Sequence, residues 1–100
     1  MLVAPALALA EVANLLSISG IGDDDAHALF HEYERAHVVH FDMTAKRVRH
    51  ALKLGLAHRI TVYDAMFLAL AQELGCPLIT ADRRAFGSIP PEIATVRLLL

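Results

Sequence analysis

The chain has 100 residues, of which 56% are hydrophobic, and a formal net charge of −2. This length suits one domain over residues 1–100, and a chain this short must bury most of its apolar surface in its own core or against a partner. No stretch reaches the roughly 18 uninterrupted apolar residues of a membrane helix, and the apolar start lacks the basic flank of a secretory signal. We therefore expect a soluble, cytoplasmic protein that makes no contact with membranes.

Charge is distributed unevenly along the chain. Residues 1–45 carry seven acids and one base, a net charge of −6, whereas residues 46–100 carry four acids and eight bases, a net charge of +4. This asymmetry favours a cationic face in the second half of the chain that could meet a polyanion.

Helical patterns dominate the first half of the chain. The apolar spacing after Pro5 predicts a helix over residues 6–18, ended by "SGIG", with Glu11 and Asn14 on one polar stripe. A second helix is predicted where the acidic turn "GDDD" opens "AHALFHEYERAH", because acids stabilise the first turn of a helix. The run "HVVHF" is typical of a short strand.

Two helices and two strands are predicted in the second half. The segment "TAKRVRHALKLGLAH" reads as an amphipathic helix, and "TVYDAMFLALAQELG" as a helix apolar on nearly every side and therefore central to the core. "CPLIT" and "ATVRLLL" are interpreted as buried strands, separated by the short turn or helix "RRAFG" and the breaker "PP". Alternating strands and helices predict an α/β fold with a parallel sheet.

The amphipathic helix has two predicted faces. The residues expected to point inward are Ala45, Val48, Ala51, Leu52 and Leu56. Those expected to point mostly outward are basic: Lys46, Arg47, Arg49, His50 and Lys53.

Three carboxylates are placed where a site is expected. In α/β sheets, ligands bind beyond the carboxyl ends of the strands, and Asp82 directly follows the predicted strand "CPLIT". Asp64 lies in the first turn of the most buried helix, and Glu11 lies on the first helix. Carboxylates that converge on one point need a bound cation or a proton, and oxygen ligands select a hard ion such as Mg²⁺ or Mn²⁺.

Each carboxylate also has a purely structural interpretation. Thr61 and Asp64 fit the capping box T-x-x-D, Asp82 suits the N-cap of "RRAF", and Glu11 suits a water-facing position on its helix. Composition and spacing leave both interpretations open.

A family resemblance favours the metal interpretation. The stretch "ITVYDAMFLALAQELGCPLITADRRAF" resembles the signature of the PIN-domain family, and "APALALAEVANLL" is similar to that family's second marker, an apolar helix with one glutamate. The resemblance covers essentially the whole chain and is nearest to the VapC-like toxins of toxin–antitoxin pairs. It implies a three-layer sandwich in which helices flank a parallel sheet.

The resemblance also implies an activity, since PIN proteins are metal-dependent nucleases that act mostly on RNA. Glu11, Asp64 and Asp82 match three of the acidic residues that hold Mg²⁺ or Mn²⁺ in the family, and Thr80 matches the hydroxyl residue beside the last of them. The bases proposed to support RNA binding are Arg83, Arg84, Lys46 and Arg49. The alternative for the basic helix face is an ordinary solvated surface.

One part of the family pattern is missing from this sequence. The family begins with a strand that ends in an aspartate, followed by a helix, and no "V-D-A/T-S"-like segment precedes Glu11. The expected fold therefore lacks its first strand, and three acids are expected to bind metal weakly or not at all. A misplaced start, a degenerate remnant and a gap filled by another polypeptide are the competing explanations. Surplus apolar surface and an open sheet predict a homodimer or higher oligomer.

Two functions follow from these observations. The first is a Mg²⁺- or Mn²⁺-dependent endoribonuclease of the toxin type, impaired by the missing aspartate and partnered by an antitoxin protein. The alternative is a catalytically inactive PIN-fold remnant that acts as a protein-interaction module.

Four histidines are expected to be surface residues, because nothing in their pattern completes a zinc site. They are His27, His31, His37 and His40.

Overall fold

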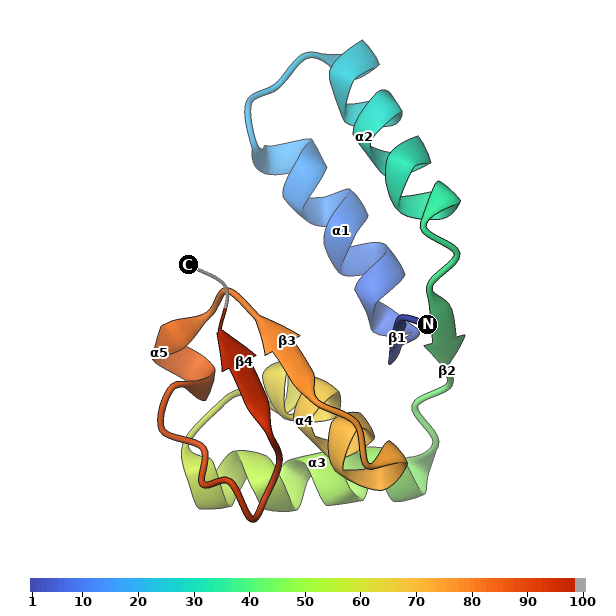
Figure 1. Ribbon diagram of the computed structural model, residues 1–100. Helices are drawn as coiled ribbons and strands as arrows, with labels where there is room; N and C mark the ends of the chain where they lie inside the picture. The colour runs from blue at the N-terminus through green and yellow to red at the C-terminus, as the bar shows by residue number, and fades with distance from the viewer. Residues whose placement is uncertain (99–100) are drawn as a thin grey trace. The chain divides into compact units, whose positions relative to one another are not determined.

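The computed structural model of the chain describes residues 1–98 and divides into two compact units, Met1–Asp42 and Met43–Leu100. Each unit has its own helices and its own pair of parallel strands (Figure 1). The predicted α/β class with parallel strands is confirmed. The prediction of a single domain over residues 1–100 stays a prediction.

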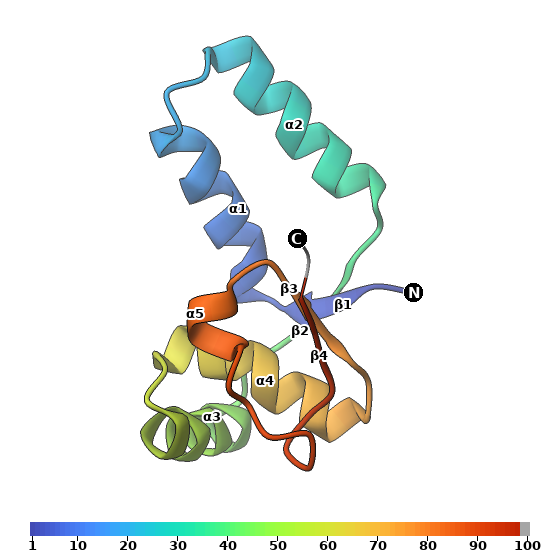
Figure 2. The same ribbon diagram turned by 60° about the vertical axis from the view of Figure 1, so that its left-hand side comes forward.

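The first unit is a helical hairpin between two short strands. In chain order its elements are β1 (Val3–Pro5), α1 (Leu7–Ile18), α2 (Asp23–Arg35) and β2 (Val39–Phe41). The helices α1 and α2 run antiparallel beside each other (Figures 1 and 2). The strands are parallel, with Val3 opposite Val39 and Pro5 opposite Phe41.

The strand β1 was not expected from the sequence. Pro5 ends it, and a proline at a strand end removes no ladder hydrogen bond, since the next backbone N–H, that of Ala6, donates to Phe41 at 2.8 Å. Three residues are too few to show the alternation of apolar and polar side chains that is typical of a strand, so β1 is recognised only by its pairing with β2. It carries no aspartate.

The second unit contains the larger hydrophobic core. Its elements are α3 (Ala45–His58), α4 (Val62–Leu74), β3 (Leu78–Thr80), α5 (Arg83–Phe86) and β4 (Val96–Leu98). The strands β3 and β4 pair in parallel, with Leu78 opposite Val96 and Thr80 opposite Leu98. The predicted strand "ATVRLLL" extends to residues 99–100, which lie outside the described residues.

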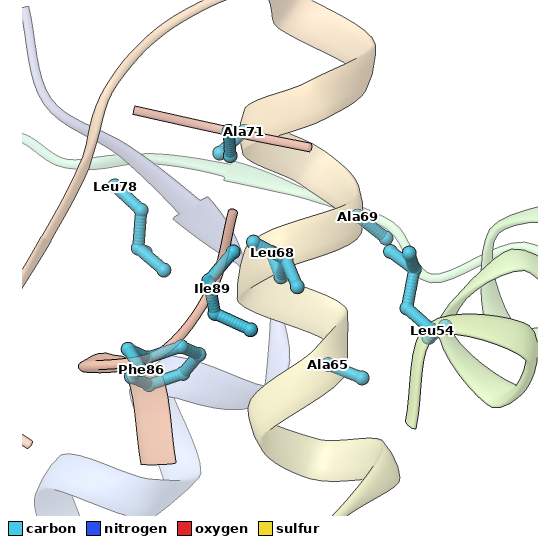
Figure 3. Packing of buried hydrophobic residues seen from close by; sticks show 10 residues of the cluster. Leu54, Ala65, Leu68, Ala69, Ala71, Leu78, Phe86 and Ile89 are labelled. Carbon is cyan, nitrogen blue, oxygen red and sulfur yellow. The ribbon is translucent and has the colours of Figure 1, made fainter. Parts of the chain in front are cut away.

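The helix α4 is the centre of this core, as its sequence predicts. Leu68 is fully buried, with Leu54 of α3 on one side and Phe86 and Ile89 on the other (Figure 3). Small residues lie where the two helices meet: a Cβ added at Gly55 of α3 would lie 3.7 Å from the Cβ of Ala65 in α4. It would also lie 3.0 Å from the carbonyl oxygen of Ile60, in the loop that joins the helices.

The inward face of α3 differs from the prediction. Ala51 is buried as predicted, but Leu52 and Leu56 are 47% and 74% exposed, and the other buried residues are Leu54 and Gly55. The predicted stripe is displaced by about one residue around the helix, because α3 meets α4 along its smallest side chains. A leucine at the position of Gly55 would not fit the close approach.

Among residues 1–98, no single helix is long and apolar enough to cross a membrane. The helices α3 and α4 pass that test of length and composition only when taken together, and they are bent by 110° at their junction.

Candidate functional site

Asp64 lies in the first turn of α4 and is half-buried. Its backbone N–H donates a hydrogen bond to Oγ1 of Thr61 at 3.1 Å, so the N-cap half of the predicted capping box is confirmed. This cap uses the backbone of Asp64 and not its carboxylate. The capping-box interpretation therefore explains why a threonine precedes α4, but it does not explain why residue 64 is an acid.

Asp82 follows β3 by two residues, at the carboxyl end of the strand. Its backbone N–H donates to Oγ1 of Thr80 at 3.0 Å, and its own Oδ1 accepts a hydrogen bond from the N–H of Ala85 at 2.9 Å. The N-cap prediction for "RRAF" is thus confirmed. Together the two bonds fix the turn between Thr80 and α5 and orient the exposed Asp82 carboxylate.

The two aspartates are attached to one hydrophobic core. Ala65, next to Asp64, and Phe86, at the end of the helix that Asp82 caps, belong to the same buried cluster (Figure 3). The burial of Ala65 and Phe86 fixes the backbone near Asp64 and Asp82.

Glu11 belongs to the first unit, on α1. Its side chain is half-buried, and its Oε1 is shielded from solvent. Burial of a carboxylate oxygen is costly without a compensating interaction, so a simple water-facing role does not describe this residue.

The chemistry of these donors suits a hard divalent cation, since all are carboxylate oxygens. Within the second unit, however, only Asp64 and Asp82 come from the predicted set, because Glu11 lies in the other unit. Among residues 1–98, no group of three or more His, Cys, Asp or Glu residues could hold a metal ion. The metal assignment therefore stays a prediction.

The basic residues of the second unit fall into two groups. Lys46 and Arg49 on α3, and Arg83 and Arg84 on α5, are exposed, as an interface with a polyanion requires. The second unit as a whole carries eight bases and four acids, a net charge of +4.

Two members of the predicted basic face are engaged elsewhere. The guanidinium of Arg47 binds the carboxylate of Glu73 on α4, and Nε2 of His50 lies 2.6 Å from Oε1 of Gln72. Both side chains are half-buried in these contacts, so the prediction that Arg47 and His50 point mostly outward holds only in part. Glu73 follows Arg47 by 26 positions, so no local spacing in the sequence could have indicated the pair.

The histidines agree with the surface prediction for the most part. His27, His31 and His37 are exposed, and Nδ1 of His31 lies 3.9 Å from Oε1 of Glu34. His40 is half-buried, and its Nε2 lies 2.8 Å from the hydroxyl oxygen of Tyr33.

A family model described as "PIN domain" matches residues 1–90. The chain belongs to the PIN domain family. The PIN signature read from "ITVYDAMFLALAQELGCPLITADRRAF" thus spans α4, β3, the turn that carries Asp82, and α5.

Curated relatives of this PIN chain are named ribonucleases. The chain is 41% identical over 46 residues to "Ribonuclease VapC3" of Pyrobaculum aerophilum, a match that covers 46% of this chain and 35% of that protein. It is 48% identical over 44 residues to "Ribonuclease VapC1" of Mycobacterium tuberculosis, covering 42% of this chain and 33% of the relative. The matched segments thus span about a third of these relatives. No solved structure matches the chain.

Proposed function

We propose that this PIN chain acts as a divalent-metal-dependent endoribonuclease of the VapC toxin type. The observation that carries the proposal is the combination of two aspartates held on one buried core with similarity to proteins named as VapC ribonucleases. RNA is accordingly the proposed substrate, and hydrolysis of its phosphodiester bonds the proposed reaction.

In this proposal Glu11, Asp64 and Asp82 are the metal-holding and catalytic carboxylates, and the ion is Mg²⁺ or Mn²⁺. When bound, such an ion supplies an activated water and stabilises the charge that develops on the phosphodiester oxygens. Thr80 has a positioning role, because its hydroxyl accepts the backbone N–H of Asp82 and holds the turn on which that carboxylate stands.

Exposed bases are proposed to bind the RNA backbone. Arg83 and Arg84 follow Asp82 directly in the chain, and Lys46 and Arg49 are exposed on α3. Contacts between these side chains and phosphates are independent of sequence, and binding would weaken as salt rises. The net charge of +4 in the second unit supports this assignment over a merely solvated surface.

The proposed cellular setting is the cytoplasm, with an antitoxin protein and a second copy of the chain as partners. Relatives with VapC names support the toxin type, and the exposed apolar residues support association.

A second function is favoured by two specific observations. No group of three or more metal-ligating side chains occurs among residues 1–98, and an oxygen of Asp82 already serves a helix cap. These features suit a PIN-fold chain without catalytic activity that serves as a protein-interaction module.

The test is cleavage of a labelled single-stranded RNA with Mg²⁺, with Mn²⁺ or with EDTA. We expect cutting that needs the metal and is lost in Asp64→Asn, whose N-cap bond to Thr61 is retained because it uses the backbone. Glu92→Gln, at an exposed acid of the same unit, is the matched control and should cut normally. Cutting that survives Asp64→Asn would point to a contaminating nuclease, and no cutting by the unaltered chain would favour the interaction module.

A further inference from the structure

Tyr63 is the only aromatic side chain among residues 1–98 that lies on the surface. It is 64% exposed, whereas the other tyrosine and the four phenylalanines are half-buried or buried. Within the part of the chain that the structure describes, its ring joins no ring pair and its hydroxyl makes no hydrogen bond. Tyr33, by contrast, stacks on Phe30, and its hydroxyl oxygen lies 2.8 Å from Nε2 of His40. The Tyr63 ring is therefore available to a partner from outside the chain.

Tyr63 also lies next to a candidate catalytic residue. It directly precedes Asp64, so the Cα atoms of the two residues are about 3.8 Å apart. Both belong to the first turn of α4. Two hydrogen bonds to Thr61 fix that turn: Asp64 donates to its Oγ1 at 3.1 Å, and Ala65 donates to its carbonyl oxygen at 2.8 Å. A group stacked on Tyr63 would therefore lie beside the Asp64 carboxylate.

A cationic side chain, that of Arg59, is exposed in the loop just before this turn. Arg59 ends α3 in the left-handed conformation, with a φ of +56°. Glycine adopts this conformation without strain and arginine does not, so stability does not explain an arginine here. Among residues 1–98 its guanidinium has no carboxylate partner. A strained backbone that presents an unpaired charge indicates a role in binding.

The two side chains together suit a single strand of nucleic acid. An unpaired base stacks on an aromatic ring, whatever its identity, because every base has a π face. A guanidinium binds phosphate oxygens. Four positions separate Arg59 from Tyr63, so their Cα atoms are at most about 14 Å apart, within the length of a few nucleotides. In a duplex the bases are already stacked on one another, so the Tyr63 ring would gain no such contact.

We propose that Tyr63 and Arg59 form a contact site for single-stranded RNA. An unpaired base stacks on the Tyr63 ring, and a neighbouring phosphate binds the Arg59 guanidinium. Because Tyr63 adjoins Asp64, the site restricts cleavage to RNA that is unpaired beside the scissile phosphate. Both residues position the substrate and take no part in breaking the bond. This inference rests on the proposed function, since RNA is its ligand, and it adds the class of RNA that is cut.

The test measures binding of three labelled probes to the full chain by fluorescence anisotropy, in EDTA so that no metal-dependent cutting occurs. The probes are a single-stranded RNA of mixed sequence, an abasic ribose-phosphate strand of the same length and an RNA duplex. Tyr63→Ala should raise the dissociation constant for the single-stranded RNA about fivefold or more, and should leave the other two unchanged. Tyr63→Phe keeps the ring and should bind all three probes like the unaltered chain.

Arg59→Gly tests the phosphate contact without weakening the fold. Since glycine suits the left-handed end of α3, this variant should melt at a higher temperature than the unaltered chain. It should nevertheless bind both the RNA and the abasic strand more weakly, and the slope of log Kd against log salt should fall by about 0.7, as for one lost phosphate contact. Weaker binding by a more stable chain is not a folding defect. Leu74→Ala, at the opposite end of α4 and 40% exposed, is the matched control and should bind normally.

Three results would overturn the inference: no binding of single-stranded RNA, RNA binding that Tyr63→Ala leaves unchanged, or equal weakening of RNA and abasic-strand binding in Tyr63→Ala. An unchanged salt slope in Arg59→Gly would remove Arg59 from the site. Cleavage of the same RNA with Mg²⁺ or Mn²⁺ distinguishes this inference from the proposed function. A chain that cuts RNA but binds it independently of Tyr63 keeps the proposed function and loses the inference. A chain that binds RNA through Tyr63 without cutting it does the reverse.

Discussion

Arg47 on α3 and Glu73 on α4 form a forked ion pair that ties the two central helices of the second unit together. The Nε of Arg47 lies 3.1 and 3.2 Å from the two carboxylate oxygens of Glu73, and one terminal nitrogen lies 2.8 Å from Oε2. The hydrogen bond from Arg47 lowers the pKa of the Glu73 carboxyl below its ordinary value. The ionised form of Glu73 is therefore the one that binds Arg47, in a contact on the surface beside the packed helices.

The first prediction is that Arg47→Met raises the pKa of Glu73 toward its ordinary value, as measured by NMR titration. Because the pKa in the folded chain is below that in the unfolded chain, the pair stabilises the fold above the unfolded-state pKa. That contribution is lost as the pH falls through the folded-state pKa. The stability difference between the unaltered chain and Arg47→Met should therefore shrink in acid. If the pKa of Glu73 were the same in Arg47→Met as in the unaltered chain, the ion pair would not be present in solution.

The second prediction concerns the core around Leu68, which is fully buried in α4. Leu68→Ala should lower the free energy of unfolding by about 2–5 kcal/mol, through lost burial and the cavity left behind. Ile18→Ala, at a side chain 71% exposed, is the control and should change it by less than about 0.5 kcal/mol. Urea denaturation measures both, and equal effects would mean that α4 is not the centre of the core.

The third prediction compares two helix ends. The helix α4 is followed by Gly75 at a φ of +63°, and α3 is followed by Arg59 at +56°, both left-handed. Since only glycine adopts this conformation without strain, Gly75→Ala should destabilise the chain by about 1 kcal/mol and Arg59→Gly should stabilise it by a similar amount. Thermal unfolding tests both changes. A stabilising Gly75→Ala would show that the left-handed cap is not formed.

The fourth prediction separates the two roles of Asp82. Asp82→Asn retains an oxygen that can accept the N–H of Ala85, so the stability should be nearly unchanged, whereas Asp82→Ala should cost about 1 kcal/mol. If Asp82 also holds a metal ion, both variants should lose RNA cleavage. Full activity in a stable Asp82→Asn would confine the residue to capping.

Local chemistry accounts for much of what the sequence predicted correctly. The caps at Thr61 and Asp82, the glycine end of α4 and the presence of a strand after Cys76 depend on residues within a few positions of one another. The predicted burial of that strand holds only at Leu78, since Ile79 is 54% exposed. The buried character of α4 follows from its apolar composition all round. The family signature is likewise a contiguous run of residues, so the PIN assignment was available from the sequence.

Long-range contacts decided the rest. Whether Leu52 points inward depends on the close approach of α3 to α4 at Gly55, and the role of Arg47 depends on Glu73, 26 positions away. The strand β1 exists only through its pairing with β2, whose residues follow more than 30 positions later.

The sequence by itself therefore determined the fold class, the helices with their caps and the family, because these follow from periodicity and from neighbours along the chain. Only the tertiary structure decided which face of α3 is buried, which bases are engaged in ion pairs and which strands pair, because helix packing and strand pairing join residues that no local pattern connects.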